Sequence, residues 1–116
     1  MKIVIFNEEL RSEMQMYLAL CNRHDVEIAD GVEDLMKLLE GDAADLTFLD
    51  LTGTEADHDR LSIANQVREK HPKIKVVGIV DHSDVELEKT ARHKGISSVI
   101  SRPIKNRELL KALEAE

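Results

Sequence analysis

Carboxylate side chains follow two of the most apolar segments of this chain, and such carboxylates can hold a metal ion or react with phosphorus. Asp50 ends the run Leu46–Leu49, and Asn7 and Glu8 come directly after the run Ile3–Phe6. Two carboxylates that lie close together repel each other and need a counter-charge, which Mg²⁺ or a nearby arginine supplies. An aspartate in such a place can itself accept a phosphoryl group. The three residues therefore predict phosphate chemistry if the fold brings them together.

Five short segments that are typical of β-strands would position these residues. Four of them are rich in β-branched residues, and three of the four are nearly continuous apolar runs, as strands covered on both faces are: residues 3–6, 46–49, 76–80 and 98–100. In residues 25–29, Val26 and Ile28 alternate with Glu27, which indicates a half-exposed strand at the edge of a sheet.

Helical periodicity fills the gaps between these segments. The fourth helix is expected over about residues 84–94, opened by a capping box of Ser83 and Glu86. The last helix is expected to bury Leu109, Leu110 and Leu113. The first helix is expected to pack one apolar face onto the sheet, made of Leu10, Met14, Tyr17, Leu18 and Cys21.

The alternation of strands and helices predicts an α/β fold with a mostly parallel sheet and helices on both faces. A single doubly wound domain over residues 1–116, of the flavodoxin-like strand order 2-1-3-4-5, places the half-exposed strand at an edge. In that order the first and third strands are neighbours at the point where ligands bind. Glu8 and Asp50 are then expected to face each other across a small pocket, with Arg102 on its far side.

Composition excludes several classes of function. The net charge is −7, with 15 acidic and 4 basic residues in 1–59 and 8 acidic and 12 basic residues in 60–116. An acidic chain with only three aromatic residues is not expected to bind nucleic acid directly. The N-terminal apolar run has only four residues, too few for a signal peptide or a membrane span. The lone Cys21, expected in the core, fits a reducing, cytoplasmic setting.

Four segments of the chain resemble the receiver domain of two-component response regulators, over essentially the full length. The most specific is the last, which combines Ala-x-x-x-Gly, a strand, a basic residue, proline and an amphipathic helix. The segments are KIVIFNEE (2–9), ADLTFLDLTG (44–53), KVVGIV (75–80) and ARHKGISSVISRPIKNRELLKAL (91–113).

The resemblance implies a signalling domain of a phosphorelay rather than an enzyme. Asp50 would accept a phosphoryl group from a histidine kinase or a phosphotransfer protein, and a downstream effector or output domain would read the result. Asn7, Glu8, Asp50 and the carbonyl of Thr52 would hold Mg²⁺. A homodimer through the fourth and fifth helices is a further expectation from the family.

The resemblance also identifies the residues around the phosphoryl group. Val80 stands where the family has a Ser or Thr that bonds the phosphoryl oxygens, and Val99 stands in place of an aromatic switch residue. Arg102 replaces a lysine, and its bond to Pro103 is a candidate cis peptide. Asp81 either offers a compensating oxygen or caps a turn.

These replacements have physical consequences. Asn7 stands where the family has an acid and carries no charge, so the affinity for Mg²⁺ should fall. Val80 removes a hydrogen bond to a charged group, which typically contributes about 1.5–3 kcal/mol. Arginine and lysine differ in shape and donor geometry, so Arg102 is not equivalent to the usual lysine.

Three hypotheses follow from the sequence. The domain is a phosphoaccepting receiver with an atypical pocket, or a degenerate receiver that serves as a docking module independent of phosphorylation. The third is a small α/β domain that binds a flavin or another phosphate ligand, which lacks support because no Gly-rich loop follows the first strand. Asp50 and Glu8 favour the first hypothesis, whereas Asn7, Val80 and the loop after Asp50 favour the second.

Overall fold

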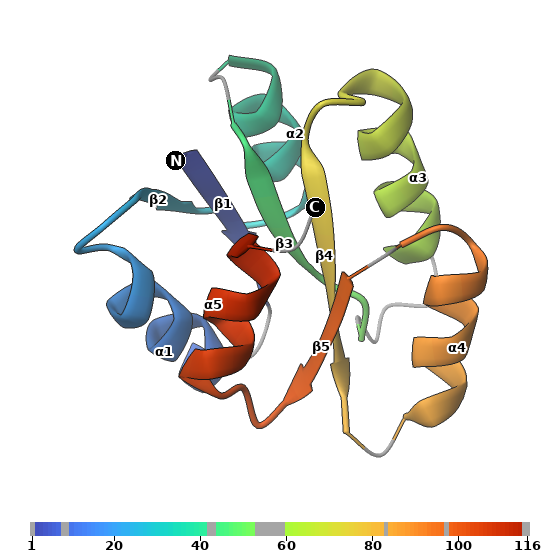
Figure 1. The fold of residues 1–116 in the computed structure, drawn as a ribbon. Helices are drawn as coiled ribbons and strands as arrows, with labels where there is room; N and C mark the ends of the chain where they lie inside the picture. The colour runs from blue at the N-terminus through green and yellow to red at the C-terminus, as the bar shows by residue number, and fades with distance from the viewer. Residues whose placement is uncertain are drawn as a thin grey trace.

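The computed structural model describes residues 2–7, 10–41, 44–52, 60–82, 84–96 and 98–114. Five strands and five helices alternate along this part of the chain (Figure 1). In order they are β1 (Lys2–Phe6), α1 (Leu10–Leu20), β2 (Asp25–Ile28), α2 (Val32–Gly41), β3 (Leu46–Asp50), α3 (Arg60–Lys70), β4 (Lys75–Asp81), α4 (Val85–His93), β5 (Ser98–Arg102) and α5 (Asn106–Glu114).

The five strands form one parallel sheet in the order β2-β1-β3-β4-β5. This order confirms the predicted flavodoxin-like α/β fold. The alternating strand β2 lies at an edge and is only partly buried, whereas every residue of the central strand β3 is buried. The two strands differ because β3 has a neighbouring strand on each side and helices over both faces, whereas β2 has a neighbouring strand on one side.

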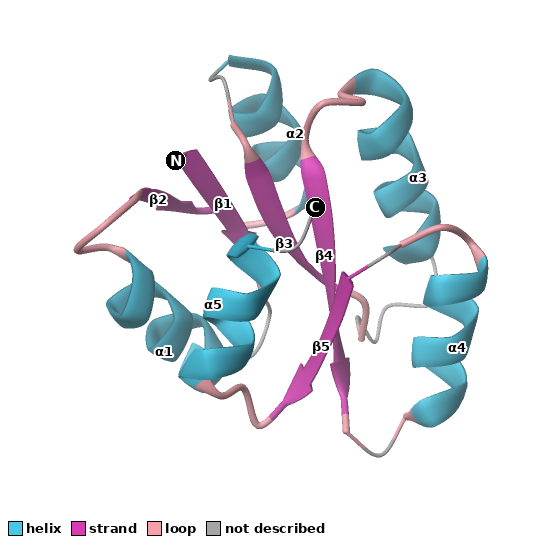
Figure 2. Ribbon diagram, in the orientation of Figure 1, coloured by secondary structure: helices cyan, strands magenta, loops and turns pink. Residues whose placement is uncertain are grey.

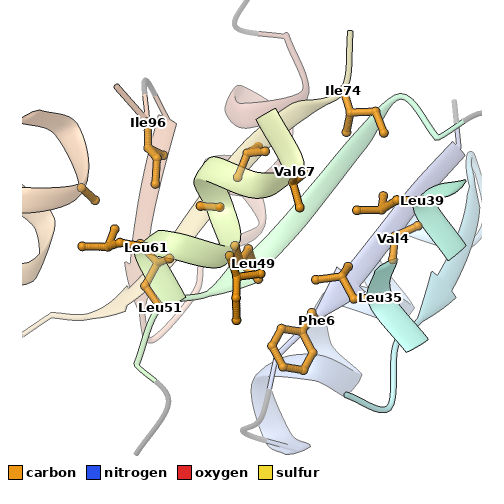
Figure 3. Packing of buried hydrophobic residues seen from close by; sticks show 14 of the residues in the cluster. Val4, Phe6, Leu35, Leu39, Leu49, Leu51, Leu61, Val67, Ile74 and Ile96 are labelled. Atoms are coloured by element: carbon orange, nitrogen blue, oxygen red, sulfur yellow. The ribbon is translucent and has the colours of Figure 1, made fainter. Parts of the chain in front are cut away.

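Helices cover the two faces of the sheet unequally: α1 and α5 lie together on one face, and α2, α3 and α4 lie on the other (Figure 2). The smaller core, under α1 and α5, is built around Phe48, Met16 and Leu109. The larger core includes Leu35 and Leu39 of α2 and Val67 of α3 (Figure 3). Leu46 and Phe48 of β3 pack into the smaller core, and Leu49 packs into the larger one.

Helix α1 packs on a different face from the one predicted. Among the side chains of α1 that the structure describes, Ser12, Met16 and Leu20 are buried, at i, i+4 and i+8, whereas Met14 and Leu18 are exposed. The sequence of this helix is apolar at nearly every position from Met16 to Cys21, so more than one apolar face fits its period. Cys21 is half-buried rather than a core residue. The predicted apolar face of α5 is also partly wrong. Leu109 is buried, as expected, but Leu110 is 46% exposed.

The ends of α4 explain part of the family-like pattern at residues 91–95. The carboxylate of Asp84 accepts a hydrogen bond from the amide of Leu87, so Asp84, and not Ser83 as predicted, is the cap among the described residues. At the other end, Gly95 has a φ of 101°, and the amides of Gly95 and Ile96 bond the carbonyls of Arg92 and Ala91. This is a Schellman ending, which requires the left-handed conformation that glycine adopts freely. Ala91 is fully buried, so Ala-x-x-x-Gly fixes both the packing and the end of α4.

Candidate functional site

The carboxyl edge of the sheet brings Asn7, Asp50 and Arg102 together. Phe6 pairs with Leu49, so Asn7, one residue further along, comes beside Asp50. Arg102 ends β5, which is separated from β3 by β4. Two strand spacings amount to about 10 Å, which a long side chain is needed to cross. We expected Arg102 on the far side of the pocket, and its strand does lie there, but its side chain reaches Asp50 directly.

The guanidinium of Arg102 is the centre of a hydrogen-bonded cluster. Its Nη1 donates to Oδ1 of Asn7 at 2.9 Å and to Oδ2 of Asp50 at 3.3 Å. Its Nε donates to Oδ1 of Asp81 at 2.9 Å, and its Nη2 donates to the hydroxyl of Thr52. Asp81 and Arg102 are register partners in β4 and β5, which brings their side chains onto the same side of the sheet. One arginine therefore links the ends of β1, β3, β4 and β5.

Both carboxylate oxygens of Asp50 accept hydrogen bonds. Oδ1 accepts from the amide of Thr52 at 2.8 Å and from the hydroxyl of Thr52 at 2.5 Å, and Oδ2 accepts from Arg102. Asp50 is only 1% exposed. A buried carboxylate needs such partners, because losing its hydration without them would be costly. The turn after β3 and the arginine from β5 thus hold Asp50 in one orientation.

The surroundings of Arg102 favour its charged form. Burial lowers the pKa of its guanidinium, but attraction to Asp50 and Asp81 outweighs burial, so the pKa is raised above its ordinary value. Arg102 is 8% exposed, whereas the side chain of Asp81 is 53% exposed. The ion pair with Asp50 at 3.3 Å is therefore shielded from solvent, and the pair with Asp81 is partly open to it.

Asn7 is oriented by the core beneath it. Its Nδ2 donates to the sulfur of Met16 in α1 at 3.7 Å, while its Oδ1 faces Arg102. Asn7 is 3% exposed, and a rotation of its amide would turn its NH₂ group, a donor, toward the N–H donors of the guanidinium. An aspartate at this position would add a second buried negative charge, which the amide avoids.

The remaining predicted site residues have different environments. Val80 is fully buried in β4, and Val99 in β5 is partly buried against the larger core. The Arg102–Pro103 peptide bond is cis, the geometry that the resemblance implied. Glu8 lies outside the residues that the structure describes.

Two contributors to the cluster were missed or undervalued from the sequence. For Thr52 we expected a role of the carbonyl only, yet its hydroxyl and amide bond Asp50. Asp81 was left between a compensating oxygen and a turn cap, and its carboxylate bonds Arg102. The available signals were a hydroxyl two residues after Asp50 and an acid placed beside Arg102 by the strand register.

Of the side chains expected to hold Mg²⁺, Asn7 and Asp50 lie among the described residues, and their observed arrangement does not fit that ion. Mg²⁺ requires about six oxygen ligands at roughly 2.0–2.1 Å in near-octahedral geometry. Oδ1 of Asn7 and Oδ2 of Asp50 instead accept hydrogen bonds from the same guanidinium nitrogen. Within the described ranges, no three His, Cys, Asp or Glu side chains come together as a metal-binding group.

Solved structures share this fold at low sequence identity. The receiver domain of NtrX from Brucella abortus aligns with a TM-score of 0.85 and 24% identity, covering 98% of this chain and 99% of that one. A longer NtrX structure from the same organism aligns with a TM-score of 0.87 and 24% identity, covering 98% of this chain and 26% of that one. The chain therefore spans about a quarter of that longer protein.

A third structure agrees with these two. The N-terminal receiver domain of a two-component response regulator from Bacteroides fragilis aligns with a TM-score of 0.86 and 20% identity, covering 97% of this chain and 92% of that one. No curated protein matches the chain. No helix within the described segments is both long and apolar enough to cross a bilayer. Residues 4–114 match the model of the response regulator receiver domain, and the chain belongs to that family.

Proposed function

We propose that this receiver domain accepts a phosphoryl group on Asp50 in a two-component signalling pathway. The single observation that carries the proposal is the position of Asp50, buried at the carboxyl end of the central strand with its Oδ2 against the guanidinium of Arg102. A fixed carboxylate beside a permanent cation suits a group that must approach a phosphate dianion.

The proposed transfer uses a phosphohistidine of a kinase or a phosphotransfer protein as donor. One carboxylate oxygen of Asp50 attacks the phosphorus, an O–P bond forms and the N–P bond breaks. The bonding electrons leave with the imidazole, which takes up a proton from water. Arg102 would then pair its N–H groups with the phosphoryl oxygens, in place of some of the bonds that it now makes.

In this role the domain is the acceptor in a phosphotransfer rather than an enzyme with its own small-molecule substrate. Its partners would be the phosphoryl donor and an effector or output domain that reads the phosphorylated state. A cytoplasmic location belongs to the same proposal. Any self-association through α4 and α5 would be a consequence of phosphorylation to test after the acceptor itself.

The direct test is the mass of the intact protein after incubation with a small N–P donor such as phosphoramidate, with Mg²⁺ and separately with EDTA. The wild-type chain should gain the mass of one phosphoryl group, and Asp50→Asn should gain none. Asp25→Asn, which removes an exposed carboxylate of β2, is the matched control and should behave as the wild type.

A second candidate is a docking module that works without phosphorylation, and two observations favour it. Val80 is fully buried where the family has a hydroxyl, and Arg102 already engages Asp50, Asn7 and Thr52. If the wild-type chain gains no mass with any donor, and its amide NMR spectrum does not change on adding beryllofluoride, the docking function replaces the acceptor function.

A further inference from the structure

Arg102 and a divalent metal ion would compete for the same oxygens. Two of the side chains expected to bind Mg²⁺, Asn7 and Asp50, present their oxygens to Nη1 of Arg102 at 2.9 and 3.3 Å. A metal ion bound to both oxygens would have to approach this nitrogen closely. The two positive charges would then repel each other in a place with little solvent to screen them.

The guanidinium is held at this position by hydrogen bonds from all three of its nitrogens. Nε, which lies before the fork, donates to Asp81, while the two terminal nitrogens donate to Asn7, Asp50 and Thr52. These are four hydrogen bonds from the three nitrogens of one guanidinium. A lysine carries a single terminal nitrogen and could not bond Asp81 and also reach both Asn7 and Asp50 in this way.

The replacements around Arg102 fit a pocket that has adapted to a fixed cation. Asn7 is neutral, which suits a monovalent guanidinium better than it suits Mg²⁺. The amide of Asn7 is turned by Met16 so that its oxygen faces Arg102. Asp81 supplies a carboxylate to the stem of Arg102, one residue beyond the buried Val80.

We infer that Arg102 is the resident cation of this pocket, positioned by Asp81, and that it takes the place of Mg²⁺ between Asn7 and Asp50. The inference rests on the proposed function only in that it concerns the same site. It does not require that Asp50 accepts a phosphoryl group. The unphosphorylated domain is then largely insensitive to Mg²⁺. Asp81 is a positioning residue, because it acts on Asp50 through Arg102.

The test is a titration of the ¹⁵N-labelled, unphosphorylated chain with Mg²⁺ at constant ionic strength, followed at the amide of Thr52. This amide bonds Asp50 and reports on its surroundings without any phosphoryl donor. Three variants are compared with the wild type. Arg102→Met removes the cation, Arg102→Lys keeps the charge but removes the fork, and Asp81→Asn weakens the hold on the stem.

We expect Arg102→Met to bind Mg²⁺ at least about tenfold more tightly than the wild type, because a nearby charge typically shifts the equilibrium of an ionic group by about tenfold or more. Arg102→Lys and Asp81→Asn should fall between the two. Arg92→Met is the matched control, since it removes an arginine whose side chain is 50% exposed on α4, and it should bind as the wild type does.

The inference is overturned if the wild type binds Mg²⁺ as tightly as Arg102→Met, or if Arg102→Lys and Asp81→Asn both leave the affinity unchanged. These two milder variants decide the matter if Arg102→Met does not fold. The titration involves no phosphoryl transfer, so its failure leaves the mass test of Asp50 unaffected. Conversely, a chain that gains no phosphoryl group can still show the competition between Arg102 and Mg²⁺.

Discussion

Two basic side chains, each paired with two acids, lie at opposite ends of the sheet. Lys2 begins β1, and its Nζ lies 3.4 Å from Asp25 and 2.9 Å from Glu27, both in the neighbouring edge strand β2. Arg102 ends β5, and it pairs with Asp50 in β3 and Asp81 in β4. Each cluster contains one cation and two carboxylates.

The difference between the two clusters lies in their partners. The side chains of Asp25 and Glu27 are 73% and 40% exposed, so water competes with Lys2 for them. Asp50 is 1% exposed, and Arg102 also bonds the neutral Asn7 and Thr52. Lys2 therefore connects β1 to the edge strand β2, whereas Arg102 connects the ends of four strands around a buried acid. Burial and donor number, rather than charge count, distinguish a structural ion pair from a candidate functional pocket.

The largest effect is expected from Arg102→Met. The variant leaves Asp50 buried without this cation, and breaking a buried ion pair from one side typically costs about 3–5 kcal/mol. Urea unfolding in EDTA, which prevents a metal ion from replacing the arginine, measures the loss. Arg92→Met is the control, with an exposed helix pair expected to contribute about 0.3–0.5 kcal/mol. Equal losses in the two variants would mean that the pocket arginine is no more than a surface residue.

A smaller effect is expected from Thr52→Val, which keeps the shape of the side chain but removes its hydroxyl. That hydroxyl donates to Asp50 and accepts from Arg102, and a hydrogen bond to a charged group is typically worth about 1.5–3 kcal/mol. The amide of Thr52 still bonds Asp50, so we expect a loss of about 1.5 kcal/mol in the free energy of unfolding. Thr90→Val, which removes an exposed hydroxyl in α4, is the control. A Thr52→Val protein as stable as this control would show that the hydroxyl is not part of the cluster.

The smallest effect is expected from Lys2→Met, because both of its carboxylate partners are open to solvent, and ion pairs of this kind contribute little and are screened by salt. Its unfolding free energy should change less than that of Thr52→Val, and the difference from the wild type should shrink further at high salt. A loss as large as that of Arg102→Met, unchanged by salt, would remove the distinction between the two ends of the sheet.

Much of the fold could be predicted because four of the five strands have a short apolar run. The alternation in β2 indicated the edge of the sheet, and chain order with the rules of parallel sheets then fixed the neighbours of β3. The face of α1 could not be predicted, since Met14 and Leu18 compete with Met16 and Leu20 for the core and only packing selects between them. The exposure of Leu110 has the same origin.

The candidate site could be predicted in outline but not in its bonding. Topology placed Asp50, Asn7 and Arg102 at one edge of the sheet. Which oxygens Arg102 contacts depends on how its side chain extends across β4. That conformation cannot be predicted from the sequence. The role of Asp81 follows from its register partner Arg102, so it became apparent only with the alignment of β4 and β5.

The coupling between Asp50 and Arg102 tests the central claim most directly. A double-mutant cycle with Asp50→Asn, Arg102→Met and the double variant, measured by urea unfolding in EDTA, isolates the energy of this pair. Residues in one buried network typically couple by about 0.5–3 kcal/mol, and we predict at least about 1.5 kcal/mol here. A cycle in which the two single changes simply add would contradict the account, because Arg102 would then not be the cation that holds Asp50.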